Sequence, residues 1–194
     1  MLIACSAFRQ PIDLRECQGR PEKDNVFTWL FASGGPALHC NAIDIFSDGL
    51  AYSDFSEEQC FRLSKPGFLP AMHELLRSKR ALLRTKAVNF DDVDDCAQII
   101  VYDRAINESY NLYDPSVYVI HGYEEKEIIT LVKLFRSIYT LLRSYAPQFV
   151  EEDYFARKLF AASESDMKNE IHKEVVEARR IYDQIQLDKL QLER

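Results

Sequence analysis

Short apolar and aromatic runs separated by turn residues dominate roughly the first 120 positions of the chain. The strongest run is residues 26–31, VFTWLF, which ends at the Ser-Gly-Gly-Pro of residues 33–36. Runs rich in β-branched and aromatic residues and bounded by glycine or proline are typical of strands. The pattern therefore predicts a mostly β structure here, with further strands over residues 97–102, 110–113 and 117–120.

Residues 38–46 and 50–55 are predicted to form a β-hairpin. The two runs flank Ser47, Asp48 and Gly49. An Asp-Gly step supplies the positive φ that a tight hairpin turn requires. We therefore expect two antiparallel strands joined at these three residues.

Helical spacing of apolar residues begins after Pro70 and continues over residues 70–85, and proline is well suited to the start of a helix. A second helix is predicted over residues 123–145, because glutamates occupy its first turn and Pro147 prevents its continuation. Residues 151–162 are predicted to form a shorter helix. A final helix, over residues 166–192, would be about 40 Å long.

These elements together predict an α+β fold. We expect an antiparallel, strongly twisted sheet built mostly from residues 20–120, with one interrupting helix, packed against two or three C-terminal helices. The chain divides into a β-rich part, residues 1–122, and a helical part, residues 123–194. No stretch rich in glycine and serine separates the two parts, so we expect them to pack together as one composite domain.

The final helix carries a heptad seam. Its apolar side chains are spaced by 4, 3, 4 and 3 residues, at Ile171, Val175, Ala178, Tyr182 and Ile185. We favour packing of this seam against the helix at 123–145; the alternative is a homodimer or a clasped partner helix. Tyr182 and Lys189 on the seam argue against a long free coiled coil.

Charge is segregated along the chain. Residues 25–61 contain five carboxylates and no Lys or Arg, namely Asp44, Asp48, Asp54, Glu57 and Glu58. A second acidic cluster comprises Asp91, Asp92, Asp94 and Asp95, and a basic cluster between the two comprises Arg77, Lys79, Arg80, Arg84 and Lys86. Surfaces that serve only solubility usually intersperse the two signs. The acidic hairpin therefore predicts a basic partner, with a merely solvated surface as the alternative, and the basic cluster is expected to be the solvated side of its helix or to pair with the acidic cluster.

Several function classes are disfavoured. A net charge of −7 opposes binding to nucleic acid or anionic lipid, and no apolar run reaches the roughly 18 to 20 residues that span a bilayer. Leu2-Ile3-Ala4-Cys5 resembles a lipoprotein cleavage box, but the charged and apolar segments of such a signal do not precede it. The five cysteines form no Cys-x-x-Cys pair, so we expect free thiols in a reducing, cytoplasmic environment.

No catalytic, metal or cofactor motif is present in the sequence. The four histidines lack metal-binding spacing, and the acidic cluster lacks the glycine and glutamate of a calcium-binding loop. Ser33-Gly34-Gly35 lacks the spacing of a dinucleotide loop. We therefore expect neither a metal nor a cofactor, and the pattern favours binding over catalysis without excluding an enzyme.

Three hypotheses for function follow. The first is a non-enzymatic cytoplasmic binding module, such as an immunity-type or antitoxin-type inhibitor, that engages a basic protein. Its charged contacts would be Asp44, Asp48, Asp54, Glu57 and Glu58, with Tyr52 and Phe55 as aromatic anchors. The second is an enzyme or ligand sensor with a pocket between sheet and helices, built from His73, Cys96, Arg104, His121 and Tyr123. The third is an adaptor that dimerises through the final helix, for which truncation at Ser163 should leave a folded β-rich half.

Overall fold

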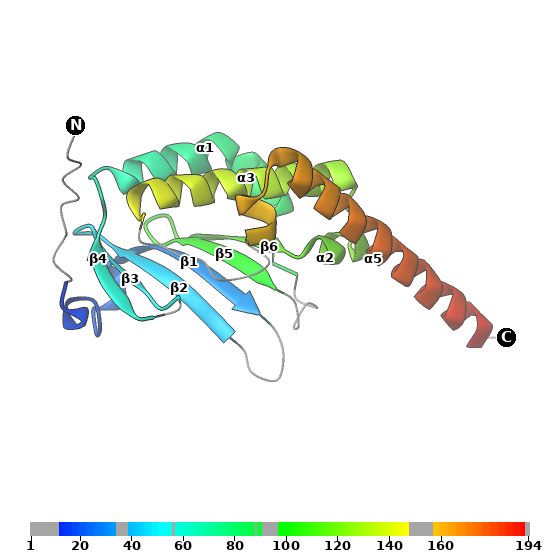
Figure 1. Ribbon diagram of the computed structural model, residues 1–194, viewed down its shortest axis with the longest axis horizontal. Coiled ribbons are helices and arrows are strands. Elements are labelled where there is room, and N and C mark those ends of the chain that lie inside the picture. Colours follow the sequence, from blue (N-terminus) through cyan, green and yellow to red (C-terminus); the bar gives the residue numbers. More distant parts are fainter. Residues whose placement is uncertain are drawn as a thin grey trace, which may run out of the picture.

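A six-stranded antiparallel sheet is the centre of the structure, in the strand order β4-β3-β2-β1-β5-β6. The computed structural model describes residues 12–33, 39–55, 57–87, 89–90, 97–147 and 157–192. Figure 1 shows helices α1 and α3 lying side by side over one face of this sheet. The predicted α+β fold is thereby confirmed, including the antiparallel sheet, the interrupting helix and the C-terminal helices.

The strands agree closely with the apolar runs of the sequence. They are β1 (Asn25–Ser33), β2 (His39–Phe46), β3 (Leu50–Ser53), β4 (Gln59–Arg62), β5 (Gln98–Asp103) and β6 (Glu108–Tyr113). β2 and β3 form the predicted hairpin, with Asp44 opposite Tyr52 and a φ of 81° at Gly49 in the turn. β4 was not predicted, because its four residues are too few to show an alternating pattern.

The main core lies between the sheet and the helices. Phe27, Trp29 and Phe31 of β1 point toward the helices and are at most 4% exposed. The Trp29 ring lies 5.8 Å from that of Tyr139 on α3 and 6.0 Å from that of Phe160. The residues between them on β1 face the opposite side of the sheet, because side chains alternate along a strand.

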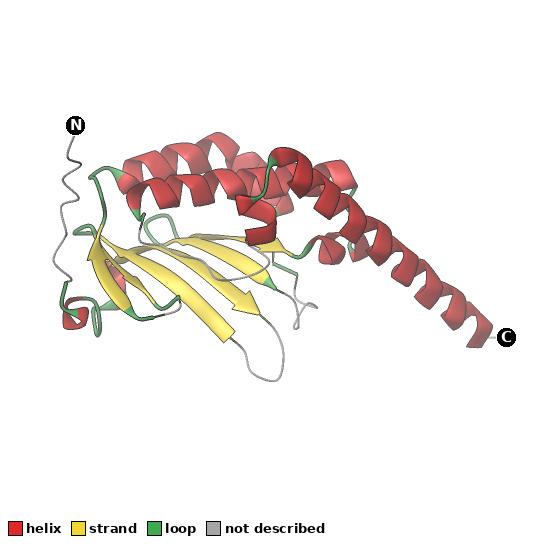
Figure 2. Ribbon diagram, in the orientation of Figure 1, coloured by secondary structure: helices red, strands yellow, loops and turns green. Residues whose placement is uncertain are grey.

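The helices are α1 (Phe68–Lys86), α2 (Pro115–Ile120), α3 (Glu125–Tyr145), the π-helical turn η3 (Arg157–Ala161) and α5 (Glu164–Leu192). Two 3-10 turns, η1 (Leu14–Glu16) and η2 (Glu22–Asp24), precede the sheet. A capping box fixes the start of α3, where the Glu127 carboxylate accepts the Glu124 N–H at 3.0 Å. α1, α3 and α5 confirm three of the predicted helices (Figure 2).

The strand predicted at residues 117–120 was wrong, because these residues belong to α2. Asp114 caps this helix by accepting the Ser116 N–H at 3.0 Å, and Pro115 occupies the first turn. An Asp-Pro step is a strong helix-start signal, and here it outweighs the β preference of the valines and tyrosine that follow. Of the shorter helix predicted at 151–162, residues 151–156 lie outside the described residues, and η3 covers residues 157–161.

α5 divides into two halves with different surroundings. Met167, Ile171 and Val175 in the first half are fully buried against the rest of the protein, where α5 contacts α2 and α3. The second half projects beyond the sheet and the other helices (Figure 1). Among the described helices, none combines the length and the apolar character that crossing a bilayer requires.

Candidate binding surface

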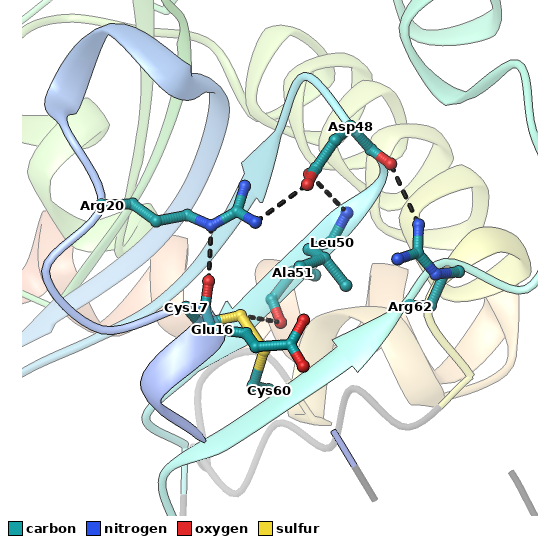
Figure 3. A network of polar contacts seen from close by, with 8 residues as sticks. All are labelled: Glu16, Cys17, Arg20, Asp48, Leu50, Ala51, Cys60 and Arg62. Atoms are coloured by element: carbon teal, nitrogen blue, oxygen red, sulfur yellow. Dashed lines mark hydrogen bonds and ion pairs between the residues drawn. A yellow bond between two sulfur atoms is a disulfide. The ribbon is translucent and has the colours of Figure 1, made fainter. Parts of the chain in front are cut away.

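A disulfide ties the N-terminal arm, residues 12–24, to the hairpin region (Figure 3). It joins Cys17, which follows η1, to Cys60 on β4, with the two Cα atoms 5.7 Å apart. The expectation of free thiols was therefore wrong for these two residues, because residues 43 positions apart meet only in the fold. Cys40 is free and exposed, whereas Cys5 and Cys96 lie outside the described residues.

Asp48 is held inside the hairpin turn. Arg20 of the arm donates to its Oδ2 at 2.8 Å, and the Leu50 N–H donates to Oδ1 at 3.1 Å. Arg62 donates to the Asp48 backbone carbonyl at 3.1 Å (Figure 3). The hydrogen bond from Arg20 lowers the pKa of Asp48. The negative charge of Asp48 is therefore already paired with Arg20, and this carboxylate stabilises the hairpin turn.

Asp44 lies on the helix-free face of the sheet. Its Oδ1 accepts hydrogen bonds from Asn25 Nδ2 at 2.7 Å and from Thr28 Oγ1 at 2.6 Å, both on β1. Asn25 and Thr28 are themselves buried. These two donors fix the orientation of a half-buried carboxylate directly opposite Tyr52 on β3.

The charges of three nearby carboxylates act on the hydroxyl of Tyr52. Partial burial raises the pKa of this hydroxyl, and the negative charges of Glu58, Asp54 and Asp44 raise the same pKa further. The Glu58 carboxylate accepts a hydrogen bond from Gln18 Nε2 at 2.7 Å, and the Asp54 carboxylate accepts the Ala42 N–H. We refer to Asp44, Tyr52, Asp54 and Glu58 as the Tyr52 patch. It brings together side chains from β2, β3 and the segment before β4.

The carboxylates of the Tyr52 patch have no cationic partner within the described part of the chain. The nearby Arg20 pairs with Asp48 instead. The basic residues of α1 also pair elsewhere, with Arg80 and Arg84 on Glu108 and Lys86 on Glu127. The acidic cluster at residues 91–95, which could have paired with α1, lies outside the described residues.

The remaining hairpin residues do not join the patch in the same way. Phe55 is only 3% exposed and belongs to the main core, so it is not available as an aromatic anchor. Phe55 continues the alternation of the buried Ala51 and Ser53, so it lies on the side of the sheet that faces the main core. Glu57 is exposed, and its N–H donates to the Phe55 carbonyl at 2.6 Å.

The residues predicted to build a ligand pocket are not brought together at one site, although His121 and Tyr123 both pack against Phe90. A pocket of about 530 Å³ lies between the hairpin turn and the start of α1, and its lining includes Phe46, Arg62 and Lys65. The described members of the predicted set lie elsewhere, with His73 beside Asp103, His121 stacked on Phe90, Tyr123 under Lys86, and Arg104 beside Glu22. The fifth member, Cys96, lies outside the described residues.

His73 and Asp103 form a buried contact that the sequence did not indicate. His73 Nε2 lies 2.7 Å from Asp103 Oδ2 but lacks the angle of a hydrogen bond, so the contact is an ion pair when the imidazole is protonated. Asp103 is fully buried and also accepts the Ala105 N–H at 3.1 Å. Burial raises the pKa of Asp103, and the charge of His73 opposes this shift. The pair joins α1 to the end of β5.

Over the described residues, no group of three or more His, Cys, Asp or Glu side chains is arranged to hold a metal ion. Comparison with known proteins found no family model, no curated protein and no solved structure that matches the chain. The chemistry of the Tyr52 patch is therefore the basis for a functional argument.

Proposed function

We propose that the chain is a protein-binding module that engages a basic partner through the Tyr52 patch. The observation that carries this proposal is that Asp44, opposite Tyr52 in the hairpin, and the neighbouring Asp54 and Glu58 have no cationic partner among the described residues, while Arg20 and the arginines of α1 pair elsewhere. Neighbouring carboxylates repel one another, and a Lys or Arg from a partner relieves that repulsion. The patch therefore favours a cation.

Arginine is the side chain that fits the patch best. Its planar guanidinium pairs with carboxylates through several donors and also stacks on aromatic rings, which here would be the ring of Tyr52. Asn25 and Thr28 already orient Asp44, so binding does not have to order this carboxylate. A preoriented acidic site beside a half-buried tyrosine is a suitable contact for a partner that presents arginine.

An immunity-type or antitoxin-type inhibitor, which masks a basic site of a toxin, is the specific role that we propose for such a module. That role needs only a complementary surface and no catalytic group. A cytoplasmic location is not part of the proposal, because disulfides such as Cys17–Cys60 persist mainly in oxidising compartments.

A peptide of alternating arginine and glycine tests the patch. The variant Asp44→Asn/Asp54→Asn/Glu58→Gln keeps the shape of each side chain and removes the three charges. We expect it to bind the peptide about tenfold more weakly at about 50 mM salt, because each exposed ion pair contributes roughly 0.2–1 kcal/mol. Fluorescence anisotropy at several salt concentrations should also show a weaker salt dependence for this variant.

The matched control removes three charges from exposed helical positions, as Glu74→Gln/Asp166→Asn/Glu177→Gln. It changes the net charge of the chain by the same amount, and we expect it to bind the peptide like the original protein. Equal weakening by both variants would show that net charge alone attracts the peptide, and the proposal would then be wrong.

A further inference from the structure

The apolar stripe of α5 continues beyond the part of the helix that is packed. Met167, Ile171 and Val175 bury this stripe against α3 and its neighbours. Tyr182 and Ile185 lie on the same side about two and three turns beyond Val175, because residues at heptad spacing share a helix face. They are 40% and 46% exposed. The side of the helix that forms the core interface thus emerges into solvent.

Ion pairs mark the place where α5 leaves the rest of the protein. His172 Nδ1 lies 3.0 Å from Glu125, and Arg179 lies 3.5 Å from Glu124, both at the start of α3. Past Arg179, the side-chain hydrogen bonds that the structure describes stay within the helix, as between Gln184 and Asp188. Figure 1 shows this end of α5 extending away from the sheet.

We propose that two copies of the chain pair in an antiparallel arrangement through residues 178–189 of α5. The two-fold axis lies between Tyr182 and Ile185. Tyr182 of one copy then faces Ile185 of the other, and Lys189 faces Ala178. This pairing is independent of the Tyr52 patch, which lies on the sheet.

The seam residues decide the orientation. In a parallel pair, each seam residue faces its own counterpart, so that two Lys189 side chains would meet across the interface. Facing like charges destabilise a pair of helices. In the antiparallel pair, the small Ala178 leaves space for the aliphatic stem of Lys189, whose ammonium reaches solvent.

The charge of the projecting half of α5 favours a second copy of the chain as the partner of its exposed face. Residues 176–192 contain three acidic and three basic side chains, Glu177, Asp183 and Asp188 with Arg179, Arg180 and Lys189. This segment is neutral although the whole chain carries −7, so two copies do not repel each other here. It also lacks the strongly cationic polar face of helices that lie on membranes.

The pairing should be weak. Residues 178–189 are only about 18 Å long, and such a contact buries about 1,000 Å², near the lower limit for a specific interface. We therefore expect a dissociation constant in the micromolar range or above. Sedimentation equilibrium of the full chain from about 1 µM to about 1 mM should show a reversible monomer–dimer equilibrium.

Two variants on opposite sides of the helix test the seam. Ile185→Glu places a charge in the interface, and we expect it to weaken dimerisation at least tenfold. Leu187→Glu is the matched control, because Leu187 is 54% exposed but lies about 200° around the helix from Ile185. It should dimerise as the original chain does. A monomer at every concentration, or equal effects of both variants, would overturn the proposal.

Cross-linking tests the orientation. A mixture of the Ala178→Cys and Lys189→Cys variants should form a disulfide between positions 178 and 189, identified by mass spectrometry of the linked peptides. Each variant alone should give little linkage, because its own thiols lie about 16 Å apart along the antiparallel pair. Linkage of 178 to 178 or of 189 to 189 would overturn the antiparallel arrangement.

Discussion

Individual carboxylates of this chain differ in whether a cationic side chain of the same protein is already paired with them. Glu108 on β6 receives Arg80 and Arg84 from α1 and the hydroxyl of Tyr110. The hydrogen bond from Arg80, followed by that from Tyr110, lowers the pKa of Glu108 to about 2. This carboxylate is occupied and joins α1 to the edge of the sheet. The carboxylates of the Tyr52 patch have no such cationic neighbours in the described structure, which is why we assign binding to them.

Replacement of Glu108 by Gln should lower the free energy of unfolding by about 1 kcal/mol at pH 7, because two half-exposed arginines lose a charged partner. The pKa of Glu108 is lowered by folding, so its contribution to stability is complete above the unfolded value of 4.5 and declines as pH falls toward about 2. The difference between the original protein and Glu108→Gln should therefore shrink over this range. Urea unfolding at pH 7, 4 and 3 measures it.

Glu74→Gln is the control for Glu108→Gln. Glu74 pairs only with Arg77 of the same helix in the described structure, and both side chains are mostly exposed. We expect its free energy of unfolding to change by less than about 0.5 kcal/mol. A difference for Glu108→Gln that stays constant down to pH 3 would contradict the assigned pKa.

The N-terminal arm is an element with little regular structure. Cys17 packs with Phe46, Leu50 and Cys60 in a small apolar cluster on the helix-free face of the sheet. The Arg20 guanidinium lies over the Phe46 ring, 4.8 Å from its centre. The disulfide adds a covalent link to these contacts and to the hydrogen bonds of Arg20 with Asp48 and of Gln18 with Glu58.

The double variant Cys17→Ser/Cys60→Ser should unfold more easily by about 2–4 kcal/mol. The bond closes a loop of 43 residues, and its removal returns conformational entropy to the unfolded chain. Urea unfolding under non-reducing conditions measures the loss. Cys40→Ser should leave stability within about 0.5 kcal/mol, because Cys40 is exposed and unbonded. Non-reducing peptide mapping that links Cys40 to Cys17 or Cys60 would refute the assigned pairing.

Among the helices and strands, those with a long periodic pattern or a clear turn signal could be predicted, whereas the short β4 and α2 could not. The hairpin followed from Asp48-Gly49, and α3 from its apolar face and charged first turn. β4 has four residues and gains its place by pairing with β3, with Phe61 in the core. α2 shows that one capping residue can outweigh the β preference of a six-residue segment.

The candidate site could be predicted only in part. The sequence located the acidic hairpin, but it did not distinguish the carboxylates that are available to a partner from those that are already paired within the protein. Tertiary contacts make this distinction, because Arg20 pairs with Asp48. The predicted aromatic anchor Phe55 is likewise withdrawn from the surface, since it is buried in the main core. The supporting residues Asn25 and Thr28 on β1 carry no sequence signal of their own. Which groups remain available to a partner depends on contacts between distant segments.

At the scale of the whole molecule, the two proposed surfaces lie far apart. In Figure 1 the hairpin of β2 and β3 is at one end, and the C-terminal end of α5 projects from the other. A dimer formed through α5 would therefore leave both Tyr52 patches exposed. Two linked patches bind a partner with repeated basic sites more strongly than one patch does, because the second contact forms at a raised effective concentration.

Two truncations separate the roles of the halves of α5. A chain that ends at residue 180 keeps Met167, Ile171 and Val175, which are fully buried, so it should unfold with nearly unchanged free energy but remain monomeric. A chain that ends at residue 163 loses all three, each worth about 1.5–3 kcal/mol of burial, so it should be strongly destabilised. Truncation at Ser163 therefore cannot test dimerisation alone, contrary to the expectation from the sequence. Calorimetry measures the stability of each truncated chain, and sedimentation equilibrium measures its self-association. Dimers of the chain that ends at residue 180 would place the interface outside the projecting half of α5.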